Sequence, residues 1–147
     1  MENKVKIKIK KLHPDAIIPS YAHMGDSGMD MYSVEDVTIK PKERATISTG
    51  IAMEYPPEYC TLLWDKSGLA SKSGITVLAG VFEHIYKGDY KVVLFNTSDK
   101  EYVVKKGDKI CQVLVQPIIT AEVEEVSELS DSVRGTNGLG STGLKKQ

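Results

Sequence analysis

Residues 90–119 read YKVVLFNTSDKEYVVKKGDKICQVLVQPII, and this stretch decides the fold. Three runs in it, YKVVLF, EYVVK and KICQVLVQPII, are rich in the β-branched and aromatic residues that favour strands. The pairs Ser98-Asp99 and Gly107-Asp108 separate these runs, and residues of these types favour turns. The stretch therefore predicts short strands joined by turns.

The same pattern extends toward the N-terminus. Lysines alternate with Val5, Ile7 and Ile9, which is the two-residue period of a half-buried strand. The runs RATISTGIAME (44–54) and YCTLLW (59–64) are further predicted strands. The turn-forming residues between these runs are Pro41, Pro56, Pro57, Gly88 and Asp89. Many short strands at this spacing predict an all-β sandwich, barrel or jelly roll.

One segment departs from the strand pattern. The run SGLASK (67–72) resembles the start of a short helix, with Ser67 as its N-terminal cap. No long window of the chain carries a helical stripe of apolar residues. Helix is therefore expected to be a minor part of the fold.

Size and composition limit the classes of protein. The chain has 147 residues, close to the usual size of one domain. Its formal net charge of −1 provides no basic field for polymeric nucleic acid, although local cations and amides can still bind phosphate. Cys60 and Cys111 lie in apolar runs far apart and are expected to be reduced core thiols. The absence of an apolar run of membrane-spanning length, or of a signal-peptide start, predicts a soluble cytoplasmic protein without a membrane partner.

The composition changes after about Ala121, where an acidic run, EVEEVSELSDS, is followed by RGTNGLGSTGLKKQ. So few apolar residues cannot offset the entropy of ordering the segment. We therefore predict a β core over residues 1–126 and a mobile C-terminal arm over residues 127–147. Arg134 and the glycines, serine and threonine after it can bind phosphate, but a flexible solubilising tail explains these residues equally well.

Two further clusters can carry chemistry. DKSGLASKSGI (65–75) combines a possible helix start with a cation and hydroxyls, a set that suits an anion. AGVFEHIYKG (79–88) places Glu83 after a short apolar strand and Tyr86 in the following turn, so that the hairpin could hold a base and a sugar. Ordinary turns between strands remain the alternative for both clusters.

Isolated polar residues are less informative. Asp30 belongs either to a polar turn or to a set of carboxylates that supports a site from behind. Gln112 lies in an apolar strand and needs hydrogen-bond partners there. His13, His23 and His84 are scattered without the spacing of metal ligands, which favours ordinary surface or hydrogen-bonded histidines.

In chain order, five segments resemble the five motifs of the trimeric dUTPase family. They are GDSGMDMY, DKSGLASKSGI, AGVFEHIYKG, KGDKICQVLV and RGTNGLGSTG, and they begin at residues 25, 65, 79, 106 and 134. The family's usual second and third motifs are Arg-Ser-Gly-Leu-Ala and Gly-Val-Ile-Asp-x-x-Tyr-x-Gly. The resemblance covers nearly the whole chain, and five motifs in the same order and spacing are highly specific.

The resemblance implies a distorted jelly-roll β-sandwich that forms a homotrimer, with each site built by more than one subunit. The implied substrate is dUTP, and the implied cofactor is Mg²⁺, held by the phosphates and waters rather than by protein ligands. Asp30 matches the aspartate of the first motif and is implied to lie behind the site. The implied substrate-binding residues are Lys66, Ser67, Gly68, Val81, Phe82, Tyr86, Lys91, Gln112, Arg134, Leu139, Gly140, Ser141 and Thr142.

The resemblance also implies roles for these positions. Ser67, Gly68 and Gln112 would hold the α- and β-phosphates, and the backbone of residues 81–91 would read the edge of uracil. Tyr86 would lie beneath deoxyribose, where it would exclude a 2′-hydroxyl. The residues of the arm, from Arg134 to Thr142, would close over the γ-phosphate.

The implied reaction is hydrolysis of dUTP to dUMP and pyrophosphate by attack of water on the α-phosphorus. Glu83 occupies the place of the family's water-activating aspartate and is the candidate catalytic residue. Its carboxylate is one methylene further from the backbone, and a displacement on the order of 1 Å can cost about 100-fold in rate. The site has therefore either shifted to fit the longer side chain or turns over slowly.

Three other positions depart from the family pattern. Lys66 replaces an arginine and so provides a point charge instead of a planar fork. Phe82 replaces an isoleucine next to the catalytic position. Leu139 replaces an aromatic residue that stacks on uracil, so base stacking is expected to be weaker.

Two alternatives follow from these departures. One is a nucleotide-binding regulatory trimer with weak or lost hydrolysis, which Glu83, Leu139 and Lys66 would favour. The other is a relative of dCTP deaminase, which shares the fold. That enzyme has a glutamate and an arginine where this chain has Val93 and Ser71, so it is the less favoured alternative.

Overall fold

The computed structural model describes residues 4–145 and contains eleven strands and one short helix in that range. The elements are β1 (Lys8–Lys11), β2 (Met29–Tyr32), β3 (Val37–Ile39), β4 (Arg44–Ser48), β5 (Ile51–Glu54), β6 (Tyr59–Trp64), α1 (Ser67–Ser73), β7 (Ile75–Leu78), β8 (Val81–Phe82), β9 (Lys91–Asn96), β10 (Tyr102–Val104) and β11 (Lys109–Pro117). The all-β prediction is confirmed.

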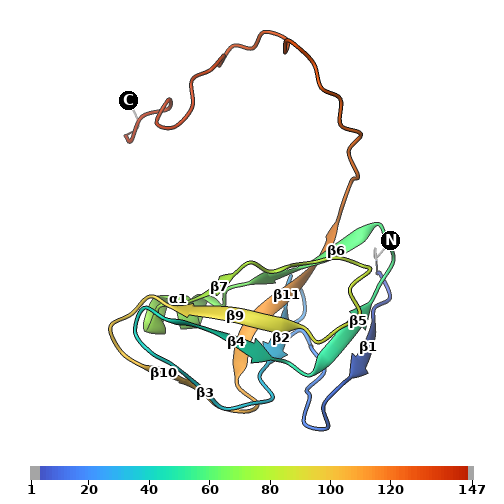
Figure 1. The fold of residues 1–147 in the computed structure, drawn as a ribbon, viewed down its shortest axis with the longest axis vertical. Coiled ribbons are helices and arrows are strands. Elements are labelled where there is room, and N and C mark those ends of the chain that lie inside the picture. Colours follow the sequence, from blue (N-terminus) through green and yellow to red (C-terminus); the bar gives the residue numbers. More distant parts are fainter. Residues whose placement is uncertain (1–3, 146–147) are drawn as a thin grey trace.

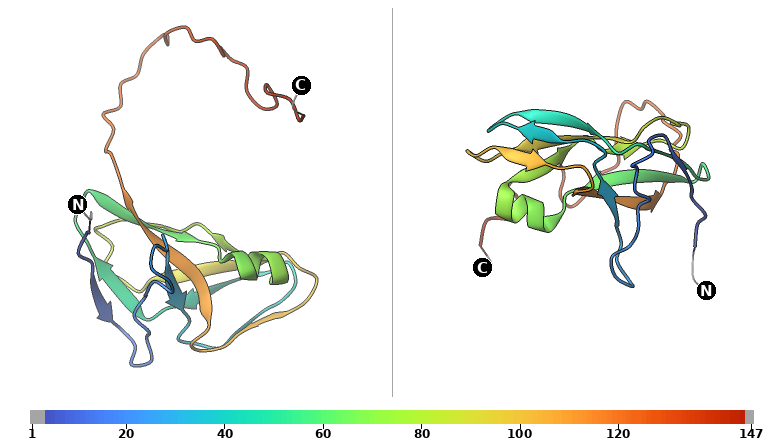
Figure 2. Two further views of the ribbon diagram at one scale, coloured as in Figure 1. Left: turned by 180° about the vertical axis from the view of Figure 1, so that it is seen from behind. Right: turned by 90° about the horizontal axis from the view of Figure 1, so that it is seen from below.

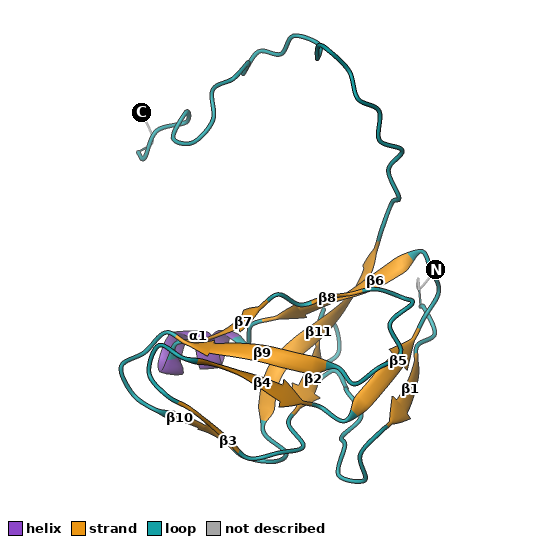
Figure 3. Ribbon diagram, in the orientation of Figure 1, coloured by secondary structure: helices purple, strands orange, loops and turns teal. Residues whose placement is uncertain are grey.

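The strands form four antiparallel sheets (Figures 1 and 3). The largest has the order β2-β11-β6-β8, and the second has the order β4-β9-β7. The pairs β1-β5 and β10-β3 make two smaller sheets. Strand β6 lies between β11 and β8 in the largest sheet, so it connects segments that lie far apart in the sequence.

The core lies between these sheets and is made of alternating side chains. In β9, Val92, Leu94 and Asn96 are buried while the residues between them are partly or fully exposed, as the two-residue period requires. Cys60 and Cys111 are free thiols in buried positions, which confirms their expected role as small core residues. Burial raises the pKa of the Cys111 thiol to about 12, so it stays neutral.

Most predicted strands are present, with two differences. The strand predicted from the alternation of Val5, Ile7 and Ile9 begins only at Lys8, in β1. The run at 59–64 is β6 with the bounds expected, but the run at 44–54 is divided into β4 and β5. The division falls at Thr49 and Gly50, where Asp89 accepts a hydrogen bond from the Gly50 amide at 2.9 Å. Thr49 donates its hydroxyl to the carbonyl of Tyr90 at 2.6 Å. At Thr49 and Gly50, these hydrogen bonds to the loop at residues 89–90 replace the strand-to-strand hydrogen bonds of a continuous β-strand.

The helix has the expected position but a different cap. Lys66 is the residue before the first helical turn, and Ser67 is the first helical residue. The prediction that Ser67 is the N-terminal cap was therefore wrong, and Lys66 makes no side-chain cap bond. Gly74 ends the helix in a left-handed conformation and donates its amide to Ala70 and Leu69 carbonyls.

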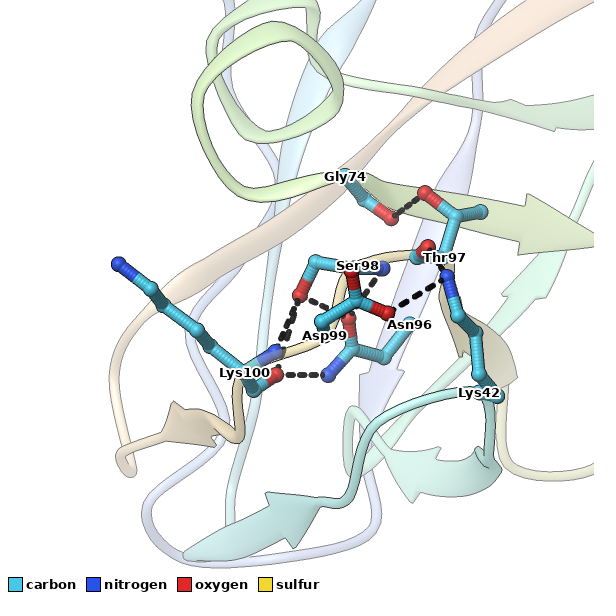
Figure 4. A network of polar contacts seen from close by, with 7 residues as sticks. All are labelled: Lys42, Gly74, Asn96, Thr97, Ser98, Asp99 and Lys100. Atoms are coloured by element: carbon cyan, nitrogen blue, oxygen red, sulfur yellow. Dashed lines mark hydrogen bonds and ion pairs between the residues drawn. The ribbon is translucent and has the colours of Figure 1, made fainter.

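The turn after β9 supports the end of this helix (Figure 4). Asn96 is fully buried, and its amide group donates to the carbonyls of Ile39 and Lys100 at 3.0 and 2.7 Å. Its side-chain oxygen accepts bonds from the amide and hydroxyl of Ser98 at 3.0 and 2.7 Å. Thr97 donates its hydroxyl to the carbonyl of Gly74 at 2.8 Å. The turn is thus fully hydrogen-bonded, and it ties the helix end to the second sheet.

The segment after β11 leaves the body of the protein (Figures 1 and 2). The amide of Ile118 still bonds to the carbonyl of Glu58 at 2.9 Å, whereas residues 119–145 are exposed and contain no strand or helix. The last strand ends nine residues before position 126, which we predicted as the end of the core. Among the described residues, no helix is long and apolar enough to cross a membrane.

Candidate active site

The candidate residues in the body of the protein lie at the two ends of β6. Toward one end, Phe82 of β8 pairs with Thr61, the third residue of β6, and Glu83 follows directly. At the other end, Trp64 pairs with Gln112 of β11, and Ser67 begins α1 just beyond. Ser67 lies six positions after Thr61, which corresponds to a distance on the order of 15–20 Å in an extended chain. Along the strand, this separation keeps Glu83 and Ser67 of one chain apart.

A buried carboxylate organises the end that carries the helix, which we call the α1 end (Asp30, Asp65, Lys66, Ser67, Gly68, Lys109 and Gln112). Asp30 lies in β2, with 6% of its side chain exposed, and forms ion pairs with Lys66 and Lys109. The Nζ atom of Lys109 lies 2.6 Å from Oδ2 of Asp30. Asp30 is thus in a strand, so the turn interpretation was wrong.

The charge balance at Asp30 decides its protonation. Burial acts to raise the pKa of this carboxyl, but hydrogen bonds and charge from Lys109 and Lys66 outweigh burial and hold it below its usual value. The contact with Asp30 raises the pKa of Lys109. Asp30 therefore keeps its negative charge at neutral pH and holds the two lysines close to the helix start.

Gln112 is half-buried and has the hydrogen-bond partner that this position requires. Its Nε2 atom donates to the carbonyl oxygen of Asp65 at 2.8 Å. Gly28 leaves the space for this side chain, because a Cβ atom there would lie 2.3 Å from Oε1 of Gln112. The Asp65 carboxylate in turn accepts bonds from the Thr76 hydroxyl at 2.8 Å and the Val77 amide at 2.6 Å. Gln112 is therefore held beside the helix start.

The other end of β6 is the hairpin end (Val81, Phe82, Glu83, Tyr86, Asp89, Tyr90 and Lys91). Glu83 is exposed, and within residues 4–145 its carboxylate makes no hydrogen bond or ion pair. Its backbone carbonyl accepts a bond from the Tyr86 amide at 3.0 Å, which closes the turn. The backbone is ordered while the carboxylate is free to bind a ligand or a water.

Three aromatic rings form the interior of this hairpin. Phe82 stacks on Tyr90, with ring centroids 4.1 Å apart and an angle of 15° between the planes. Tyr86 is tilted against both rings and donates its hydroxyl to the Asp89 carbonyl at 2.8 Å. Gly88 allows this position, because a Cβ atom there would lie 2.6 Å from the Tyr86 hydroxyl. The ring of Tyr86 is 41% exposed, so one part of it faces solvent.

The side chain of Asp89 joins the hairpin to the break between β4 and β5. Its carboxylate accepts hydrogen bonds from the Ser48 hydroxyl at 2.6 Å and from the Gly50 amide at 2.9 Å. The amide of Tyr90 donates to the Ile51 carbonyl at 2.8 Å. The base of the hairpin is therefore fixed to the neighbouring sheet.

Sequence reasoning missed the polar groups beneath the hairpin. Tyr55, Thr61 and Tyr90 are buried, and their hydroxyls contact one another below Phe82. In the sequence, Thr61 and Tyr90 belong to runs that predict ordinary strands, and Tyr55 directly follows another such run. The one available signal was Thr61, a hydroxyl residue at a position that the strand period assigns to the core.

The candidate residues of the arm lie away from both ends of β6. The Arg134 guanidinium donates to the carbonyls of Asn137 and Gly138 at 2.7 and 3.2 Å, which are contacts within its own turn. Leu139 is fully exposed, and residues 140–142 are exposed as well. Between residues 119 and 145, no hydrogen bond joins the arm to the body.

The fold and the two ends of β6 define a class of protein: a jelly-roll β protein whose charged end suits an anion and whose hairpin presents a free carboxylate. The dUTPase family model matches residues 14–143. The chain belongs to the dUTPase family, as its five sequence motifs predicted.

Related proteins match this chain in sequence over nearly its whole length. The deoxyuridine 5′-triphosphate nucleotidohydrolase of Clostridium acetobutylicum is 49% identical over 144 residues, which are 97% of this chain and 99% of that protein. The corresponding protein of Clostridioides difficile is 48% identical, over 94% of this chain and 98% of that one.

Solved structures show the same fold. A mutant dUTPase of Staphylococcus bacteriophage 80alpha with dUpNHpp superposes with a TM-score of 0.89 at 29% identity, covering 95% of this chain and 99% of that chain. A mutant dUTPase of phage phi11 of S. aureus, whose structure describes a structural Mg(II) ion, has a TM-score of 0.80 at 26% identity and covers 86% and 99%. The predicted jelly roll is therefore confirmed.

Proposed function

We propose that this chain hydrolyses dUTP to dUMP and pyrophosphate, with Glu83 as the residue that activates water. The observation that carries this assignment is the free carboxylate of Glu83 on an otherwise fully bonded hairpin. A carboxylate without an ion pair can accept a hydrogen bond from water and take its proton. Membership of the dUTPase family supplies the substrate.

In the proposed reaction, the water oxygen bonds to the α-phosphorus while its proton moves to Glu83. The bond between the α-phosphorus and the oxygen that bridges to the β-phosphorus breaks, and pyrophosphate leaves with that oxygen. Positioning and neutralisation of charge supply most of the rate enhancement in such reactions. The chain therefore needs a fixed base at one end of the substrate and fixed donors along the phosphates.

The α1 end provides suitable donors. The backbone amides and hydroxyl at Ser67 and Gly68 begin a helix whose first turn has no cap, so these groups are available to α- and β-phosphate oxygens. Gln112 is held beside them. Lys66 is bonded to Asp30, but an ammonium group has three donors and can contact a phosphate oxygen as well.

The hairpin end provides a place for the nucleoside. The backbone of Val81, Phe82 and Lys91 borders the hairpin and can pair with the polar edge of uracil. The exposed face of Tyr86 can lie against deoxyribose, where a 2′-hydroxyl would collide with the ring. These contacts would select a deoxyuridine nucleotide over its ribose counterpart.

The distance along β6 supports sites built between subunits, as in the homotrimer that the family resemblance implies. The water on Glu83 must come within about 3–3.5 Å of the α-phosphorus. Glu83 and Ser67 of one chain are separated by a distance on the order of 15–20 Å. We therefore infer that the hairpin end of one subunit faces the α1 end of another, as in a closed ring of identical heterologous contacts.

Magnesium would enter with the nucleotide. Among residues 4–145, no group of three or more His, Cys, Asp or Glu side chains is placed to hold a metal ion. The donors at the α1 end are instead ammonium, amide and hydroxyl groups, which suit phosphate oxygens. Mg²⁺ keeps several water ligands and binds readily to phosphates, where it would neutralise charge on the triphosphate.

Residues 127–147 would act as a mobile arm that closes over the γ-phosphate. Arg134 can exchange its hydrogen bonds to the carbonyls of the arm for hydrogen bonds to phosphate oxygens. Gly140, Ser141 and Thr142 can add backbone amides and hydroxyls as further donors. Leu139 would cover the base. The cytoplasmic location expected from the sequence is part of the same proposal, because the proposed substrate is a free nucleotide.

The central test is the release of pyrophosphate from dUTP, dCTP, dTTP and UTP with Mg²⁺. We expect the wild-type chain to turn over dUTP selectively and Glu83→Gln to lose about 10²–10⁴-fold in kcat, the usual contribution of a general base. Binding of dUpNHpp should survive in the variant. Tight binding of dUTP without turnover in the wild type would instead indicate a regulatory protein.

A second test concerns the site between subunits. Glu83→Gln and Ser67→Ala each damage a different half of the site. If the halves come from different chains, unfolding and refolding an equal mixture restores about a quarter of the sites, because each half is intact in half of the chains. A mixture no more active than its separate components would show that the site lies within one chain.

A further inference from the structure

A chain of buried hydroxyl groups lies beneath the hairpin and ends at the carbonyl oxygen of Phe82. Tyr55 follows β5, Thr61 lies in β6, and Tyr90 precedes β9; all three are buried, with exposed fractions of 5%, 0% and 0%. The Tyr55 hydroxyl lies 2.7 Å from the Phe82 carbonyl. The Thr61 hydroxyl lies 3.3 Å from that of Tyr55 and 2.7 Å from that of Tyr90.

The distances assign a direction to these hydrogen bonds. A carbonyl can only accept, so Tyr55 gives its single proton to Phe82. Tyr55 must then accept from Thr61, and Thr61, having used its proton, must accept from Tyr90. The alternative route from Tyr90 directly to Tyr55 spans 3.5 Å and is too long to compete. The bonds from Tyr90 to Thr61 and from Tyr55 to Phe82 are short, and the longer contact between Thr61 and Tyr55 joins them more weakly, so Tyr55 acts directly on the Phe82 carbonyl and the other two hydroxyls support it.

This arrangement is a costly way to fill a core. Burial of a hydroxyl is unfavourable unless it is hydrogen-bonded, and apolar side chains of similar volume avoid that cost. Burial also raises the pKa of Tyr90 above its usual value, so its hydroxyl keeps the proton that begins the chain. The stacked ring of Phe82 covers the network from the hairpin side.

The hydrogen-bond network ends at the carbonyl of Phe82, directly before Glu83, the proposed base. The Phe82 carbonyl belongs to the peptide group whose nitrogen is that of Glu83. A hydrogen bond to this carbonyl fixes the plane of that peptide, and the plane sets the direction in which the Glu83 side chain leaves the backbone. Glu83 stands in the place of an aspartate and is longer by one methylene, so its carboxylate needs a different starting direction.

We infer that Tyr55 is a positioning residue for Glu83. Through the Phe82 carbonyl, its hydroxyl holds the peptide group so that the longer carboxylate reaches the water beside the α-phosphorus. Thr61 and Tyr90 support Tyr55 in this role. The inference rests on the proposed function, because it concerns the same base and the same water.

The test is Tyr55→Phe, which keeps the ring and removes only the hydroxyl. We expect kcat for dUTP to fall about 10-fold, since a hydrogen bond of ordinary strength is lost from the support of the base. The dissociation constant of dUpNHpp should stay within about 2-fold of the wild-type value, because the groups that contact the nucleotide remain. A merely structural role would weaken analogue binding together with kcat.

Two further variants complete the test. Thr61→Val removes the middle hydroxyl but keeps the bond from Tyr55 to Phe82, so the expected fall in kcat is smaller, about 3-fold. Tyr102→Phe is the matched control, because Tyr102 is a half-buried tyrosine of β10 whose hydroxyl makes no hydrogen bond within the described residues. It should leave kcat and analogue binding unchanged.

Unchanged kcat in Tyr55→Phe overturns the inference, and so does a fall in kcat matched by an equal loss of analogue binding. A larger effect of Thr61→Val than of Tyr55→Phe also overturns it, because packing and not the hydroxyl chain would then matter. Should Tyr55→Phe fail to fold, Thr61→Val decides by the same two readouts. The wild type and Glu83→Gln in the same assay separate this result from a failure of the proposed function.

Discussion

The two ends of β6 hold their functional residues by different kinds of interaction. At the α1 end, a buried aspartate is held between two lysines, and the resulting cluster is charged. At the hairpin end, neutral hydroxyls and stacked rings support a backbone that presents one free carboxylate. The difference suits the chemistry, because an anion needs a positive field whereas a base needs a fixed position and no competing cation.

The comparison predicts that each end responds to a different perturbation. Geometry dominates at the hairpin end, so small changes of side-chain length there should affect rate. Charge dominates at the α1 end, so changes of charge and pH there should affect stability and phosphate binding.

The largest expected effect is a change of length at the hairpin end. Glu83→Asp restores the residue usual in the family but withdraws the carboxylate by one methylene from a site supported for glutamate. A displacement on the order of 1 Å can cost about 100-fold, so we expect kcat for dUTP to fall by that factor while dUpNHpp binding is kept. A variant as active as the wild type would show that the hairpin is not adapted to glutamate.

Next in size is a change of charge at the α1 end. Asp30→Asn leaves Lys66 and Lys109 without their carboxylate, and we expect the free energy of unfolding in urea to fall by about 2 kcal/mol, the loss of charge-assisted hydrogen bonds. Asp36→Asn is the control, because its pair with Lys105 is exposed to solvent and should contribute less to stability than the buried cluster. Equal effects of the two variants would contradict a special role for the buried cluster.

The pH dependence of the same comparison has a definite sign. The folded protein holds the pKa of Asp30 below its usual value, so the stabilisation is complete above the unfolded pKa of about 3.9 and is lost as pH falls through the lower folded pKa. The difference in unfolding free energy between wild type and Asp30→Asn should therefore be constant near neutral pH and shrink below about pH 4. A difference that grows in acid would rule out this linkage.

A smaller effect is expected from crowding the α1 end. In Gly28→Ala, the new methyl would lie 2.3 Å from Gln112 Oε1, so the Gln112 side chain must move away from Asp65. We expect KM for dUTP to rise about 5-fold through the loss of one neutral hydrogen bond near the phosphates, with kcat little changed. An unaltered KM in Gly28→Ala would remove Gln112 from the binding site.

The smallest expected effect comes from the arm. Leu139→Phe restores an aromatic ring where the family has one, and stacking on the base should tighten dUpNHpp binding about 3-fold. Leu144→Phe adds the same ring at another fully exposed position of the arm and should not change binding. If both variants bind alike, Leu139 does not cover the base.

Much of the fold was predictable because local patterns and tertiary structure agree. The strand at 59–64, the strand segments within 90–119 and the turns between them follow from residue type and two-residue period. The unbroken run at 44–54 was not predictable in its final form, because Asp89 from another part of the chain takes up the Gly50 amide. Ser67 failed as a cap because Lys66 occupies the position before the first helical turn.

The sequence nominated the residues of the candidate site but not the groups that support them. The order of the motifs nominated Glu83, Tyr86, Ser67 and Gln112, because each lies within a segment that resembles a family motif. The network of buried hydroxyls was missed because Tyr55, Thr61 and Tyr90 come from three separate regions of the sequence. Each of them resembles an ordinary core residue by itself. A hydrogen-bond network between distant segments leaves no local pattern.

By itself, the sequence determined the all-β class, the family and the identity of the candidate base, because periodicity, turn chemistry and motif order are local properties of the chain. Only the tertiary structure decided that Asp30 is buried between two lysines, and that Glu83 and Ser67 lie at opposite ends of one strand. The physical reason is that burial and separation depend on how strands pair, and pairing joins residues that the sequence keeps far apart.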